Sequence, residues 1–182
     1  MNPQKTTSRA RILRICAPHF TSVIKLKNRA ELFDGVAKLI RKFRQTDIDG
    51  IMDIWLNANL AAHSFIPAEY WKGNFESVKE MLPQAEVYVY ENGREIQGFL
   101  GLSGNFIEGI FVSEKMRSHG IGKCLLDYVK AKKSELQLNV YRKNKRAIRF
   151  YEREGFEIQS EGVDESTDEK DYLMIWRQSR FF

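Results

Sequence analysis

A glycine-containing loop is the segment of this 182-residue chain whose residues suggest chemistry most directly. It follows an apolar stretch ending at Phe111-Val112 and precedes a helical pattern that begins at Ile121. Backbone N–H groups and the positive helix end at such a junction bind phosphate or pyrophosphate, and glycines let the ligand approach the backbone. An anion-binding loop is therefore predicted at Arg117-Ser118-His119-Gly120-Ile121-Gly122-Lys123.

Two common phosphate motifs do not fit this loop. The pair Gly122-Lys123 is followed by Cys124 rather than by serine or threonine, so it is not a P-loop. Leu125 stands where the dinucleotide-binding fingerprint requires its third glycine. From this segment alone, a pair of turn glycines without a ligand remains the alternative.

A second segment places polar residues on one face of a helix. Asn144 and Tyr151 are seven residues apart in a pattern that predicts a helix over 144–154, so their side chains share a face. Gly155 then suits a left-handed helix end. The alternatives are structural, because Asn144 is a good helix N-cap and a tyrosine on an amphipathic helix is often a core residue.

The two segments together resemble the GNAT N-acetyltransferase superfamily. Arg117-x-x-Gly120-x-Gly122 is similar to its motif A, and the run from Asn144 to Gly155-Phe156 is similar to its motif B. Ala62-His63-Ser64-Phe65-Ile66, followed by Tyr70-Trp71, is similar to small bacterial members, some of them regarded as protein-lysine acetyltransferases. The resemblance covers about residues 39–177.

The resemblance implies acetyl transfer from acetyl-CoA to a primary amine by direct attack in a ternary complex. The loop backbone would hold the pyrophosphate, the preceding strand would pair with the pantetheine arm and polarise the acetyl oxygen, and Asn144 would contact the cofactor. Tyr151 would protonate the departing thiolate, since a phenol with a pKa of about 10 is protonated at neutral pH. The implied cofactor residues are Ile110, Phe111, Val112, Arg117, Ser118, His119, Gly120, Ile121, Gly122, Lys123 and Asn144.

Two residues are candidates for the base that deprotonates the amine. Glu108 lies on the central strand, where some family members carry a glutamate base, and strand alternation predicts that it shares a face with Phe106 and Ile110. His63 is the competing base or a wall of the acceptor pocket. Each also has a structural interpretation, Glu108 as a solvated or salt-bridged residue and His63 as a helix-end histidine bonded to backbone.

The apolar spacing predicts a mixed α/β fold in which helices and strands alternate along the chain. The resemblance implies that the central sheet is mostly antiparallel, with helices on both faces. The predicted strands cover 39–43, 85–90, 96–103, 106–112, 136–141, 156–159 and 172–176. The predicted helices cover 48–60, 67–81, 121–132 and 144–154, and an acidic, mobile loop is expected over 161–171.

The net charge of +5 is concentrated in an N-terminal extension. Residues 1–38 carry eight basic and two acidic side chains, whereas residues 39–182 carry 21 basic and 22 acidic ones. The sequence therefore predicts an extension over 1–38 and an acetyltransferase domain over 39–182. The extension is interpreted as a targeting peptide, a basic docking arm or an appended tail.

Composition also narrows the partners. A domain with a net charge of −1 has no general attraction to nucleic acid, and no stretch of the sequence is apolar enough to span a membrane. Two cysteines and three histidines without ligand spacing predict no metal site and a reducing, cytoplasmic environment. The expected partners are acetyl-CoA and an amine acceptor, for a monomer or homodimer. The rival interpretation is a non-catalytic acyl-CoA-binding or sensing module.

Overall fold

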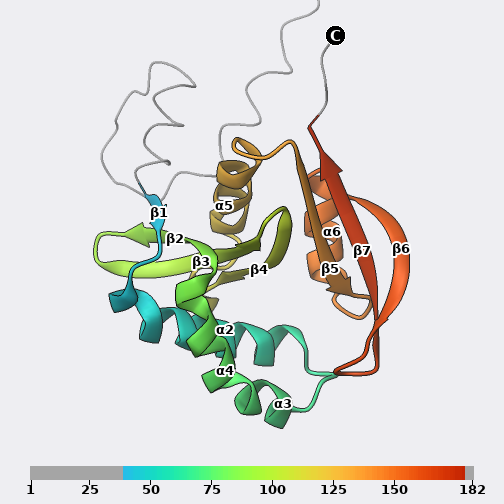
Figure 1. The fold of residues 1–182 in the computed structure, drawn as a ribbon, viewed down its shortest axis with the longest axis horizontal. Helices are drawn as coiled ribbons and strands as arrows, with labels where there is room; N and C mark the ends of the chain where they lie inside the picture. The colour runs from blue at the N-terminus through green and yellow to red at the C-terminus, as the bar shows by residue number, and fades with distance from the viewer. Residues whose placement is uncertain (1–38, 179–182) are drawn as a thin grey trace, which may run out of the picture.

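One seven-stranded sheet organises residues 39–178, the part of the chain that the computed structural model describes (Figure 1). The spatial order is β1-β2-β3-β4-β5-β7-β6. The strands are β1 (Ile40–Lys42), β2 (Glu86–Asn92), β3 (Glu95–Ser103), β4 (Phe106–Val112), β5 (Glu135–Tyr141), β6 (Glu157–Asp164) and β7 (Glu169–Arg177). Every neighbouring pair is antiparallel except β4 with β5, which confirms the mostly antiparallel sheet.

Helices cover both faces of this sheet, as the resemblance implied. The α-helices are α2 (Ile48–Ala62), α3 (Ala68–Gly73), α4 (Phe75–Met81), α5 (Ile121–Lys130) and α6 (Lys145–Arg153). Alternate residues of one strand point to opposite faces. In β2, Val87 and Val89 pack in the core cluster that contains α2 and α3, whereas Tyr88 and Tyr90 pack in the cluster that contains α5 and α6.

The predicted helix over 67–81 is wrong in one respect, because the segment forms two helices. The helix is interrupted at Asn74, whose side-chain amide donates a hydrogen bond to the Tyr70 carbonyl oxygen at 2.8 Å. A side chain that competes for a helix carbonyl in this way favours a helix end. Pro83 lies in a short 3₁₀ turn, Leu82–Gln84, rather than directly at the end of the helix.

The mobile acidic loop expected over 161–171 is also wrong. Strand β6 extends to Asp164 and β7 begins at Glu169, so only a four-residue turn separates them. Almost every residue of β6 is exposed, because this strand lies at the edge of the sheet. Because neither face of β6 is buried, the strand lacks the alternation of apolar and polar residues by which a strand is recognised in a sequence. Backbone pairing with β7 holds it instead.

Strands β4 and β5 diverge soon after they meet. Their register contains a single pair, Phe106 with Gln137, while β4 stays paired with β3 along most of its length. Figure 1 shows the two halves of the sheet opening away from each other at this point. The edge of β4 that faces β5 therefore has backbone groups beyond Phe106 that no described strand pairs.

Residues 1–38 lie outside the described residues, and so do the three interpretations of that segment. Among residues 39–178, no helix has both the length and the apolar character needed to cross a bilayer.

Candidate active site

The divergence of β4 and β5 opens a cleft of about 780 Å³. Its lining comes from β4, β5, the second half of α2, α3, one face of α6 and the facing parts of β6 and β7. Tyr151 belongs to the core cluster on the α6 face, and Trp55 to the cluster on the α2 face, yet both line this cleft. The cleft therefore connects the two faces of the sheet.

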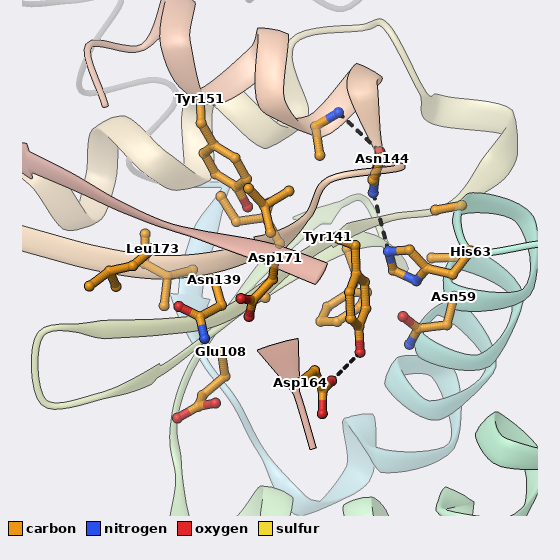
Figure 2. A pocket seen from close by; sticks show the side chains of 18 of the residues that line it. Asn59, His63, Glu108, Asn139, Tyr141, Asn144, Tyr151, Asp164, Asp171 and Leu173 are labelled. Carbon is orange, nitrogen blue, oxygen red and sulfur yellow. Dashed lines mark hydrogen bonds between the residues drawn. The ribbon is translucent and has the colours of Figure 1, made fainter. Parts of the chain in front are cut away.

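Tyr151 lies two turns into α6, with its ring held by neighbouring aromatic rings. The ring centroids of Phe150 and Phe156 lie 5.1 and 5.5 Å away in edge-on geometry. Only 8% of the residue is exposed, and Figure 2 shows its hydroxyl end directed into the cleft. Burial raises the pKa of Tyr151, since it disfavours the phenolate. The residue therefore presents a protonated hydroxyl.

Asn144 and His63 are hydrogen-bonded across the cleft (Figure 2). The side-chain oxygen of Asn144 accepts a bond from the Ala147 backbone N–H at 3.1 Å and so caps α6. Its nitrogen then points to His63 Nε2 at 3.2 Å. The amide can only donate there, which assigns the His63 proton to Nδ1. Burial lowers the pKa of His63 to about 4, so the ring is neutral at physiological pH.

Replacing Asn144 with alanine is expected to lower the free energy of unfolding by about 1 kcal/mol, because α6 loses its N-cap. The corresponding fall in melting temperature is about 3 °C, measured by thermal unfolding. Asn144→Asp is the matched control, since aspartate keeps an oxygen for the Ala147 N–H and loses only the donor to His63. An equal loss in both variants would contradict a capping role.

Glu108 occupies a β-bulge. The register of β3 with β4 passes from Gly101–Gly109 to Leu102–Ile107, and so leaves Glu108 without a cross-strand partner. The bulge breaks the expected alternation, because Ile107 and Ile110 both pack in the α5 and α6 cluster. The prediction that Glu108 shares a face with Ile110 is therefore wrong, whereas Phe106 and Glu108 both line the cleft. Glu108 is exposed, lines the cleft and points away from Tyr151 in Figure 2.

The glycine loop adjoins the cleft at the start of α5. Gly120 has φ +82°, a backbone conformation that favours glycine, and α5 begins at the next residue. A Cβ at Gly122 would lie 3.8 and 3.9 Å from the side chains of Ile110 and Val112. The helix N-terminus therefore lies over the end of β4, where the unpaired strand edge continues.

Other members of the predicted loop have side-chain contacts of their own. Lys123 pairs with Glu154 at 2.8 Å and with Asp127 at 3.1 Å. Arg146 donates to the Ser118 hydroxyl at 3.1 Å, and His119 Nδ1 lies 2.9 Å from the Arg117 carbonyl oxygen. What Lys123 offers a ligand in this arrangement is thus its backbone N–H rather than an unpaired ammonium group.

The structure brings some predicted site residues together and leaves others beside the cleft. The predicted residues that line it are His63, Glu108, Ile110, Phe111, Asn144 and Tyr151. Val112 and the loop from Arg117 to Lys123 are not part of that lining and lie in the adjoining segment.

Sequence reasoning missed the polar residues on β5, β6 and β7. The cleft is also lined by Asn139, Tyr141, Asp164 and Asp171. Tyr141 donates a hydrogen bond to Asp164, and burial is the main cause of the raised Tyr141 pKa. The two aspartates fell within the stretch interpreted as a mobile loop. Gly162 and Asp164 are residue types that are rare in strands, so the local sequence carried no signal of a strand there.

The fold and the cleft define an acyl-CoA-dependent N-acyltransferase architecture: a sheet opened between β4 and β5, a glycine loop at the adjoining helix, and a buried tyrosine in the opening. The comparisons with known proteins agree. Residues 83–158 match the family described as "Acetyltransferase (GNAT) domain". The chain is 33% identical over 140 residues to the peptidyl-lysine N-acetyltransferase YiaC of Escherichia coli K12, covering 76% of this chain and 96% of YiaC. This chain belongs to the GNAT acetyltransferase family.

Solved structures show the same fold. The solution structure of apo YjaB from Escherichia coli superposes with a TM-score of 0.68 at 29% identity, covering 75% of this chain and 95% of that one. The PaiA N-acetyltransferase of Thermoplasma acidophilum, solved with coenzyme A, has a TM-score of 0.63 at 20% identity and covers 76% and 98%.

Proposed function

We propose that this acetyltransferase uses acetyl-CoA to acetylate the side-chain amine of lysine in a peptide or protein. The observation that carries the proposal is the charge of the cleft. It is lined by Glu108, Asp164 and Asp171, whereas its lining among the described residues includes no lysine or arginine. Such a cleft favours a cationic acceptor over an anionic one, because opposite charges attract more strongly where water is excluded.

The cofactor's place follows from the loop and the β4 edge. The backbone N–H groups from Arg117 to Lys123 would hold the pyrophosphate at the start of α5. The unpaired edge over Ile110, Phe111 and Val112 would bond the pantetheine amides and polarise the acetyl oxygen. This path leads towards Tyr151, whose protonated hydroxyl suits a donor to the departing thiolate. A module that only bound acyl-CoA would not need that donor.

His63 fits the wall of the acceptor pocket better than it fits the base. Its Nε2 is already bonded by Asn144, and a group with a pKa of about 4 is a weak proton acceptor. Its ring stacks on Trp71, with 5.2 Å between centroids. His63 Nδ1 and Trp71 Nε1 are buried and have no hydrogen-bond partner within residues 39–178. A peptide carbonyl in the cleft would satisfy such a donor, which supports a peptide acceptor.

Lysine-containing peptides are expected to stimulate thiol release from acetyl-CoA, measured with a thiol reagent. Peptides with neutral or basic flanks should have lower KM values than peptides with acidic flanks, because the cleft is acidic. The matched control is each peptide with its lysine already acetylated, which keeps the backbone and removes the nucleophile. If no lysine peptide, N-terminal peptide or polyamine stimulated release above hydrolysis, the proposal would be wrong.

A further inference from the structure

We propose that Asp171 is the group that accepts the proton of the incoming ammonium. This inference rests on the proposed acetyl transfer to an amine and names the base within the same cleft. Asp171 lies on β7, opposite Tyr141 of β5 and opposite Gly162 of β6. Residues directly opposite each other in an antiparallel pair present their side chains on the same face. Figure 2 shows the Asp171 carboxylate in the cleft, between Asn139 and Tyr141.

Asp171 is a largely buried residue whose carboxylate has no counterion within residues 39–178. Its exposed fraction is 7%, yet within residues 39–178 its side chain makes no ion pair and accepts no hydrogen bond from another residue. An ionised carboxylate without a cationic partner is costly in a residue that is largely buried. Asp164, in contrast, accepts bonds from Tyr141 and from the Ser166 backbone N–H. Asp171 is therefore the cleft carboxylate with the strongest need for a cationic ligand.

The neighbouring strand leaves space for this carboxylate. A Cβ built on Gly162 would lie 2.9 Å from Asp171 Oδ1, which is closer than such atoms pack. Gly162 does not have a positive φ, so its backbone does not require glycine. A side chain at position 162 would therefore displace the Asp171 carboxylate from the place that it occupies.

The chemical environment suits proton transfer. Burial and the charge of Asp164 raise the pKa of Asp171, although its own backbone N–H opposes the shift. The same burial acts to lower the pKa of an ammonium that entered the cleft, whereas the cleft carboxylates act to raise it. Burial by itself therefore brings the two pKa values closer, which makes proton transfer from ammonium to carboxylate less unfavourable. Neither Glu108, which is exposed, nor His63, which is bonded through Nε2, combines these properties.

The proton balance of the reaction then closes. Asp171 takes one proton from the ammonium and leaves a lone pair on the amine nitrogen. That lone pair forms the bond to the acetyl carbon as the carbon–sulfur bond breaks, and Tyr151 gives its proton to the thiolate. The second proton lost from nitrogen returns to the Tyr151 phenolate, and Asp171 releases its proton to solvent. Ammonium and acetyl-CoA thus yield the amide, the free thiol and one proton.

The test compares Asp171→Asn with the wild type on a lysine peptide, by steady-state kinetics from pH 4 to 10, so that the range includes the ordinary aspartate pKa. We expect kcat to fall by about 10²-fold or more at pH 7, because the variant has no base. The wild-type rate should rise with pH as Asp171 ionises, through a pKa above the ordinary aspartate value. The variant should lose this limb and recover only at high pH, where the free amine is abundant.

Matched variants separate proton transfer from folding and from binding. Asp168→Asn makes the same change in the exposed β6–β7 turn and should leave kcat and the pH profile unchanged. Gly162→Ala should lower kcat by displacing the Asp171 carboxylate while keeping the pH limb. Calorimetric coenzyme A affinity equal to that of the wild type shows that each variant is folded.

Three outcomes would overturn the inference. They are a kcat of Asp171→Asn within twofold of the wild type, a rise in its KM alone, and an unchanged pH limb. A rise in KM alone would make Asp171 a counterion for the ammonium and not its proton acceptor. Each outcome requires an active wild type, so the failure of this inference is distinct from the failure of the proposed function. An inactive wild type would count against the proposed function and thereby against the inference.

Discussion

Replacement of Tyr151 with phenylalanine is expected to lower kcat by about 10²-fold or more while leaving coenzyme A affinity unchanged. The substitution keeps the ring that packs between Phe150 and Phe156 and removes only the hydroxyl that reaches the cleft. Without that proton donor, the thiolate must leave as an anion in a site where water is scarce. Thiol release measures the turnover, and calorimetry measures the affinity.

The pH dependence gives a second measurement of the same role. Because burial raises the Tyr151 pKa, the phenol stays protonated well above neutral pH, and the wild type should keep its activity there. Tyr128→Phe is the matched control. It removes a phenol hydroxyl on α5, where the ring packs edge-on against Tyr88 and outside the cleft lining. If Tyr151→Phe retained full turnover, Tyr151 would be a core residue and the thiolate would need another donor.

Replacement of Gly120 with glutamate is expected to abolish coenzyme A binding. The residue has φ +82° immediately before α5, so any side chain there strains the backbone. A carboxylate at the helix N-terminus would also repel the pyrophosphate and take up the N–H groups proposed to bind it. Isothermal titration calorimetry should detect no binding at coenzyme A concentrations that saturate the wild type.

Gly93→Glu separates the loss of a ligand site from the strain of the backbone. Gly93 has φ +67° in the β2–β3 hairpin turn, with no atom within 4 Å of an added Cβ. The same substitution therefore imposes a similar conformational cost away from the loop. Gly93→Glu should bind coenzyme A like the wild type. If Gly120→Glu and the wild type bound coenzyme A with equal affinity, the pyrophosphate would not bind at this loop.

Most of the fold was predictable because its local signals are strong. Strand β4 was predicted with the bounds that it has, and the strands predicted over 96–103 and 136–141 each begin one residue early in the structure. Burial on at least one face leaves apolar residues at regular spacing in these strands. The break at Asn74 was not predicted, because one side-chain bond to a backbone carbonyl decided it while the apolar spacing ran on.

The residues of the candidate site likewise divide into those that a local pattern predicts and those that only strand pairing brings together. The glycine loop and the Asn144–Tyr151 face each lie within one short segment, so backbone geometry and helical period already place their residues. The acidic side of the cleft was not visible, because Asp171 and Asp164 reach it only when β6, β7 and β5 pair. The Asn144–His63 bond likewise joins residues 81 positions apart.

The amino-acid sequence by itself determined the family, the loop at Gly120 and the helix that carries Tyr151. Each is recognised from the types and spacing of residues that are near neighbours in the chain. The tertiary structure alone decided which side chains line the cleft. The bulge at Glu108 and the divergence of β4 from β5 are long-range features of sheet pairing, and no local pattern encodes them. They moved Glu108, the expected base, out of register, and they left the Asp171 carboxylate in the opened sheet with no counterion within residues 39–178.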